Sequence, residues 1–466
     1  MKNFFLAALA LLCLSCAAQS ATSSGVIIQN VAVVDVRNGT VLPGRTVVVR
    51  DRQIDGIFAA GQEPSNKDIP TRVDGTGKFL IPGLWDMHVH SVFGDWFPRG
   101  KEISLPLFVA NGITGVRDMG SELDVLLQWR KEITAGTLVG PRMVVAGPML
   151  DGPKPRFPSS VAITTPEDGR HAVDNLKARG ADFIKLQSLI PADAVFAIAD
   201  EAHKQNISFV GHVPDSVRAS DLSNAGLKSL EHLIGIFEGS SPLEDQFLRG
   251  GKTEGKFLSS YDPARAMALF ALLAKNHTWV CPTLVWERGG NLLDEDMAGF
   301  AHDNRAKYVP TYWKNVTWKR FEDEILEGYK IDDLATRKRF VRKELEVVNE
   351  MRQAGVEFLA GTDTAAGVYV FPGFSLHEEL QQFVAAGFTP LAALQTATTN
   401  PARFLGMEGQ LGTVEKGKIA DLVLLGANPL GDIRNTQKIS GVIANGRYFS
   451  RQDLDKLLAG VVSAAK

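Results

Sequence analysis

Residues 79–91 read FLIPGLWDMHVHS, an apolar run in which His88 and His90 stand two positions apart. Side chains two positions apart in a β-strand share a face, so both imidazoles should lie on one side of a strand. Two such histidines can also be ordinary hydrogen-bonded residues near a strand end. The pair therefore indicates a metal site only if the fold brings further ligand-type side chains to it.

The middle of the chain alternates between strand-like and helix-like segments, which predicts an α/β fold, a TIM-like (β/α)8 barrel. We expect the barrel over about residues 81–405, with an insertion at about 236–350 that we interpret as helices and loops over the barrel mouth. The expected strands lie near 80–88, 114–118, 142–147, 182–187, 208–212, 228–232, 278–284 and 357–362.

Both ends of the chain are rich in short apolar strands. Residues 21–80 contain Asn38-Gly39 and residues 406–466 contain Asn445-Gly446, and Asn-Gly is a strong signal for a hairpin turn. We therefore expect the two ends to pair as a small composite β-sandwich, with a terminal helix at the end of the chain.

Residues 1–20 combine a short positive start, an apolar stretch and small residues, which predicts a secretory signal and export to the periplasm or the exterior. The apolar run is too short for a stable membrane span. Cys16 partly fits a lipoprotein motif, but Cys13 occupies a place that is usually aliphatic, so a lipid anchor is the less favoured reading. Without the signal only Cys281 remains, which excludes an intrachain disulfide.

The composition is that of an ordinary globular protein, with 466 residues, 45% hydrophobic and 22% charged, and a net charge of −3. No basic stripe stands out, which argues against a nucleic-acid partner and leaves a small-molecule substrate as the expectation. The sequence leaves open whether the chain forms a homo-oligomer.

Further polar residues fall at the expected strand ends. His212 ends the fifth strand, His232 the sixth and Asp363 the eighth, and active sites of this fold gather at that end of the barrel. Lys185 lies within the apolar fourth strand, where a bare ammonium group is costly to desolvate. Reaction with CO₂ would convert its amine into a carbamate, an anionic group able to bridge two divalent cations.

These residues lie in motifs that resemble the amidohydrolase superfamily of metal-dependent hydrolases, and the secreted, lysine-containing form resembles its imidodipeptidase or Xaa-Pro dipeptidase-like group. The motifs are PGLWDMHVH, DFIKL, GHVP, SLEHL, AGTD, TNPARFLG and GTVEKGKIADLVLL. The resemblance implies a (β/α)8 barrel with a composite β-sandwich, two divalent ions with Zn²⁺ favoured, and hydrolysis of a C–N bond in a small, dipeptide-like substrate by a metal-bound hydroxide.

The resemblance also implies roles for individual residues. One ion would take His88, His90 and Asp363, the other would take His212 and His232, and carboxylated Lys185 would bridge them. Asp363 would also be catalytic, moving a proton from the attacking water to the leaving nitrogen. Residues that hydrogen-bond to such ligands usually orient them, and Asp86 and Asp118 are the candidates here.

Candidate substrate contacts are Lys154 and Arg156 in one loop, Arg117 beside the second strand end, and His377 after the eighth strand. Each has a plain alternative, such as a solvated loop or an Arg117–Asp118 pair. The same metal site could also serve a cyclic-amide hydrolase, a lactonase or a deaminase. From another class, a periplasmic binding protein that kept the barrel and lost catalysis would fit the fold.

Overall fold

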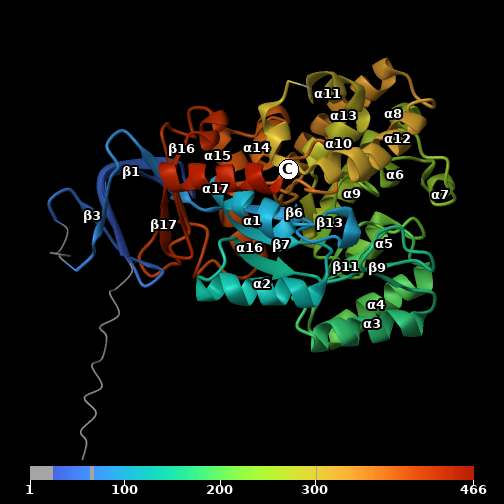
Figure 1. The fold of residues 1–466 in the computed structure, drawn as a ribbon. Coiled ribbons are helices and arrows are strands. Elements are labelled where there is room, and N and C mark those ends of the chain that lie inside the picture. Colours follow the sequence, from blue (N-terminus) through green and yellow to red (C-terminus); the bar gives the residue numbers. More distant parts are fainter. Residues whose placement is uncertain (1–24, 63–67, 301) are drawn as a thin grey trace, which may run out of the picture.

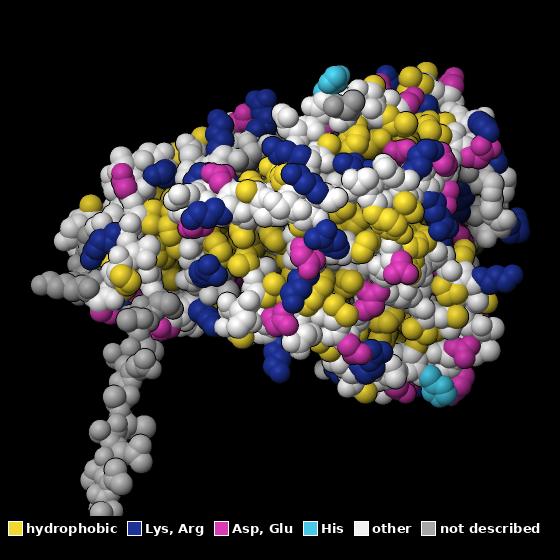
Figure 2. Space-filling model, viewed as in Figure 1, with side chains coloured by type: hydrophobic (Ala, Val, Ile, Leu, Met, Phe, Trp, Pro, Cys, Tyr) yellow, Lys and Arg dark blue, Asp and Glu magenta, His cyan; other side chains and the backbone are white. Residues whose placement is uncertain are grey.

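A computed structural model describes residues 25–62, 68–300 and 302–466 (Figure 1). The expected signal at residues 1–20, with Cys13 and Cys16, lies outside the described residues. Within those ranges, no helix has the length and apolar character needed to cross a bilayer. Figure 2 shows basic and acidic side chains interspersed over the face in view.

The two ends of the chain share one mixed sheet, which Figure 1 shows with its blue and red strands together at one end of the molecule. Its order is β17-β16-β15-β5-β1-β2-β3, with β4 also paired to β1. The strands are β1 Gly25–Asp35, β2 Thr40–Arg50, β3 Gln53–Ala59, β4 Thr71–Asp74, β5 Phe79–Pro82, β15 Leu422–Leu425, β16 Ile439–Ala444 and β17 Arg447–Ser450.

Local sequence explains how this sheet forms. The predicted Asn38-Gly39 turn joins β1 to β2, and Gly39 has φ +79°, a conformation that glycine adopts without strain. Strand β5 pairs antiparallel with β15, so a strand near residue 80 and a strand near residue 423 lie side by side. The described part of the sheet also curls, because Gln53 of β3 bridges to Ile419 just before β15.

Parallel strands form the barrel-like centre. One sheet has the order β6-β7-β8 and another has the order β10-β9-β11-β12-β13-β14. The amide of Asp182 donates to the carbonyl of Val145 and links the two sheets. The strands are β6 Leu84–Val89, β7 Ile113–Asp118, β8 Arg142–Val145, β9 Met149–Asp151, β10 Ser160–Ala162, β11 Phe183–Leu186, β12 Ser208–Gly211, β13 Ser229–Glu231 and β14 Trp279–Cys281.

The segment expected as the eighth strand, 357–362, has no continuous ladder. Phe358 makes a parallel bridge to Val280 of β14, and Thr364 makes one to Val89 of β6. Its backbone therefore spans the gap between the last and first strands of the centre through isolated pairs. The short strands β9 and β10 were not predicted.

Helices separate the parallel strands as the sequence predicts. Thr165 caps α3 together with Asp168, and Pro166 occupies the first turn, where a proline fits a helix. The helices outside the 236–350 segment are α1 Gly100–Ala110, α2 Leu123–Ala135, α3 Pro166–Ala178, α4 Ala192–Lys204, α5 Ala219–Asn224, α14 Phe374–Ala385, α15 Pro390–Thr396, α16 Thr399–Phe404 and the terminal α17 Arg451–Ala464.

Residues 236–350 are mainly helical, and Figure 1 shows several of these helices together beyond the parallel strands. Strand β14 lies within this segment and belongs to the central sheet. Its α-helices are α6 Ile236–Gly239, α7 Glu244–Phe247, α8 Glu254–Ser260, α9 Pro263–Lys275, α10 Leu284–Asn291, α11 Leu293–Phe300, α12 Lys319–Gly328 and α13 Leu334–Gln353.

Candidate active site

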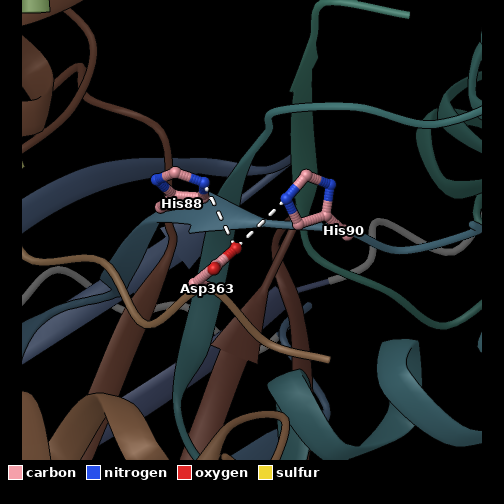
Figure 3. A group of neighbouring side chains, drawn as sticks. All are labelled: His88, His90 and Asp363. Atoms are coloured by element: carbon pink, nitrogen blue, oxygen red, sulfur yellow. Dashed lines mark ion pairs between the residues drawn. The ribbon is translucent and has the colours of Figure 1, made fainter. Parts of the chain in front are cut away.

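His88 of β6, His90 directly after β6 and Asp363 of the 358–364 segment meet at one end of the parallel strands (Figure 3). Asp363 Oδ1 lies 3.3 Å from His88 Nε2 and 3.1 Å from His90 Nε2. All three side chains are at least nine-tenths buried. These imidazole nitrogens and the carboxylate oxygen lie close enough together to bind one metal ion, and both are common ligands of Zn²⁺.

Two more histidines extend this cluster. His232 Nε2 lies 4.0 Å from Asp363 Oδ2, and its ring centroid lies 4.9 Å from that of His88. The ring of His212 is 4.9 Å from the ring of His232. The structure thus brings together the four histidines named in the sequence, from three strand ends.

Lys185 on β11 lines the same cavity as these residues and is 1% exposed. Its Nζ has no hydrogen-bond partner among the residues that the structure describes. Burial lowers the pKa of Lys185 to about 8, which leaves part of the amine uncharged near neutral pH. An orphaned buried amine beside four imidazoles fits the expected carbamate chemistry better than it fits a structural lysine.

Each histidine uses its other ring nitrogen for a fixed protein contact. His88 Nδ1 lies 2.9 Å from Glu231 Oε2, and His90 Nδ1 lies 2.8 Å from the carbonyl of Gly120. The corresponding contacts of the other two rings are His212 Nδ1 to Ser188 Oγ at 2.8 Å and His232 Nδ1 to Thr283 Oγ1 at 2.6 Å. Such contacts fix the ring orientation and leave Nε2 for a metal ion.

The electrostatics of the cluster also fit cation binding. Burial lowers the pKa of His88 to about 4 and that of His232 to about 3, so both rings are neutral at neutral pH, as metal ligation requires. Burial opposes ionisation of Asp363, but the surrounding histidines outweigh it and hold the pKa of this carboxyl well below its usual range. The residues present therefore suit divalent metal ions.

The cluster forms the floor of a cavity of about 510 Å³. Its wall is largely apolar, and part of it comes from α10 and α12 within the 236–350 segment. The apolar wall residues include Phe93, Met149, Phe157, Trp286, Phe321 and Ile325. A small organic substrate with an apolar group suits this space.

The predicted substrate contacts lie in different places. Arg156 lines the cavity and pairs with Glu324 of α12, whereas Lys154 is exposed and is not part of the cavity wall. Arg117 is fully buried and bound to Glu231, so we correct its predicted role. His377 is also misassigned, because it is buried between the carbonyl of Asn111 and Thr436 Oγ1, outside the cavity lining.

The predicted orienting residues need correction too. Asp86 accepts hydrogen bonds from the amide and hydroxyl of Thr362, and Asp118 accepts one from the amide of Ser91, so neither contacts a histidine ring through a hydrogen bond. Sequence reasoning missed Glu231, although it stands directly before His232 in SLEH. Cys281 is a free cysteine and is buried.

Comparisons with known proteins agree with this geometry. The model of the amidohydrolase family matches residues 79–448. Ochratoxinase of Aspergillus niger is 25% identical, over 88% of this chain and 84% of its own length. A candidate prolidase of known structure from Bifidobacterium longum is 26% identical, covers 94% of this chain and 99% of its own, and has a TM-score of 0.68.

A bottromycin amidohydrolase of known structure has a TM-score of 0.70 and covers 96% of this chain and 91% of its own. At 22% identity, this likeness supports a shared fold alone. The likeness gives the chain a TIM-barrel-like fold of mixed α/β content. The chain belongs to the amidohydrolase family and is a hydrolase that acts on carbon–nitrogen bonds.

Proposed function

We propose that the chain is an exported, binuclear metal-dependent hydrolase that cleaves the amide bond of a small, dipeptide-like substrate. The observation that carries this proposal is the buried Lys185 amine, which has no hydrogen-bond partner among the described residues and lines one cavity with the histidines and Asp363. The candidate prolidase and ochratoxinase among the similar proteins favour an amide substrate. In the same proposal, the parallel strands close a (β/α)8 barrel, and the mixed sheet is a composite β-sandwich.

His88, His90 and Asp363 would hold one ion, and His212 and His232 the other, with carboxylated Lys185 as the shared ligand. When bound, such a pair of ions, with zinc favoured, supplies Lewis acidity that polarises the scissile carbonyl and makes water acidic enough to attack near neutral pH. Lys185 would become this ligand when its uncharged amine adds to CO₂ and releases one proton.

Asp363 would move the proton in the reaction. Its carboxylate stays ionised at neutral pH, so it can accept a proton from the attacking water and then donate it to the leaving nitrogen. Glu231, Gly120, Ser188 and Thr283 would keep the four imidazoles in place while this happens. The apolar wall would exclude bulk water from the reacting atoms.

The test combines metal analysis with an activity screen. Protein prepared with zinc and bicarbonate should contain about two ions per chain and hydrolyse members of a library of dipeptides and N-acyl amino acids. Asp363→Asn should keep the fold and lose turnover. Asp215→Asn is the matched control, because Asp215 lines the same cavity but pairs with Lys252, so this variant should retain both ions. Full activity after exhaustive chelation would exclude the proposal.

A further inference from the structure

Gln187 is a polar residue of the cavity wall that the proposed chemistry does not use. It follows β11 directly and stands two positions after Lys185, so the two side chains share the face that looks into the barrel centre. At about 3.3 Å per residue, Gln187 lies about 7 Å further along the strand, toward the mouth. Both residues line the cavity.

The amide of Gln187 is only half satisfied. The side chain is 5% exposed, and Oε1 has no hydrogen-bond partner among the described residues. Its other end, Nε2, lies 3.7 Å from Met149 Sδ. A thioether sulfur can only accept, so this contact orients the amide and leaves Oε1 as the open acceptor. Buried polar atoms without a partner are rare, which points to a group that arrives with the substrate.

A neutral N–H group fits this acceptor better than an ammonium group. An ammonium group in an apolar cavity needs a carboxylate partner. The carboxylates that line this cavity outside the metal cluster already have partners within the protein. Asp151 accepts from the backbone amides of Leu189 and Gly152, Asp215 pairs with Lys252, and Glu324 pairs with Arg156. A neutral amide N–H needs only the oxygen that Gln187 offers.

We propose that Gln187 Oε1 accepts the N–H of the scissile amide, so that the enzyme selects secondary amides over tertiary ones. This inference rests on the proposed amide hydrolysis and names its substrate class. Xaa-Pro bonds and N-methylated peptides lack this N–H and place a carbon against the oxygen. The acceptor then stays buried and unpaired, and the lost interaction reduces kcat/KM about 10- to 100-fold.

The experiment compares matched substrates on the zinc-loaded enzyme. The substrates are N-benzoyl-leucine and N-acetyl-phenylalanine, which carry no ammonium group and whose aromatic groups suit the Phe93, Phe157 and Phe321 wall. Each is compared with the counterpart that is methylated on the scissile nitrogen. The wild type should prefer each secondary amide. Gln187→Met, similar in length and apolar, should lower this preference at least 10-fold, whereas Gln187→Glu keeps an acceptor oxygen and should retain a preference.

A second measurement separates binding from turnover. Calorimetry on the Asp363→Asn variant should give tighter binding of the secondary amides than of their methylated partners, and adding Gln187→Met should remove the difference. Equal rates on secondary and tertiary amides, or an unchanged preference in Gln187→Met, would overturn the role of Gln187 and leave the proposed hydrolase standing. A zinc-loaded wild type that cleaves none of these amides would overturn both.

Discussion

The ion pair between Arg117 and Glu231 lies beneath the histidine cluster and offers the sharpest energetic test of the structure. Both side chains have no exposed surface. Arg117 donates to both oxygens of Glu231 at 2.8 and 2.9 Å, to the carbonyl of Met87 at 2.6 Å and to Ser229 Oγ at 2.8 Å. Since Glu231 also contacts His88 Nδ1, the pair connects the interior beneath the parallel strands to the candidate metal site.

Removing one partner leaves the other charge buried without a counter-ion. Burial opposes ionisation of Glu231, but Arg117 and His88 hold the pKa of this carboxyl well below its usual range, so Arg117→Met leaves a buried anion. Breaking a fully buried pair in this way costs about 3–5 kcal/mol of unfolding free energy. Glu231→Gln leaves the guanidinium of Arg117 buried without its counter-ion and should lower the unfolding free energy by a similar amount. The double variant contains neither charge and should be no less stable than either single variant.

The assay is urea unfolding of the metal-free protein for the wild type, both single variants and the double variant, read as a double-mutant cycle. The coupling energy should reach about 3 kcal/mol or more. The control cycle uses Arg130 and Asp182, a pair whose side chains are about one-third exposed and whose coupling should stay below about 1 kcal/mol. If the Arg117–Glu231 coupling is no larger than that of the control, the buried-pair argument is wrong.

Three further predictions concern other buried groups. Burial and the neighbouring Glu287 raise the pKa of Glu344 well above its usual value, so the native state holds a proton that the unfolded chain loses above about pH 4.5. The contribution of Glu344 to stability should therefore fall by about 1.4 kcal/mol per pH unit as the pH rises above its usual pKa value, and Glu344→Gln should remove that part of the slope in urea titrations. Lys185→Met should reduce bound zinc from about two ions to one or none and abolish any bicarbonate dependence of metal uptake, measured by elemental analysis. Gly361→Ala should place a Cβ 2.5 Å from Cys281 Sγ and 2.9 Å from the amide nitrogen of His88. The variant should therefore lose about 1–3 kcal/mol of unfolding free energy in the same urea assay and bind zinc more weakly. An unchanged stability would contradict this close approach.

Much of the fold follows from local patterns in the sequence. Helix α2 ends at Ala135, directly before Gly136 with φ +78°, and α3 begins after its Thr165 cap, because caps depend on a few neighbouring residues. The gathering of His88, His90, His232 and Asp363 was also predictable, since parallel strands present their carboxyl ends at one edge. The broken pairing of residues 358–364 was not predictable, because it depends on the spacing between β14 and β6.

The sequence pattern does not predict most of the contacts that hold the imidazoles. His90 uses the carbonyl of Gly120, a backbone atom that no residue type reveals. Thr283 reaches His232 from 51 positions away, and only the packing of neighbouring strands brings them together. Asp86 was a reasonable candidate by its alternation with His88, yet its oxygens bind Thr362 and thereby tie the 358–364 segment to β6.

Backbone conformation explains why the prediction found His232 and missed its neighbour Glu231. Strict strand alternation places consecutive side chains on opposite faces, which would allow only one of the two to reach His88. The structure places both against His88, and His232 has φ +60°, in the left-handed region. That conformation costs a non-glycine residue about 1–2 kcal/mol, and it turns the His232 side chain back toward the cluster. Asp363 has the same φ of +60°, so two proposed ligands sit where the backbone leaves the regular strand, which alternation alone cannot anticipate.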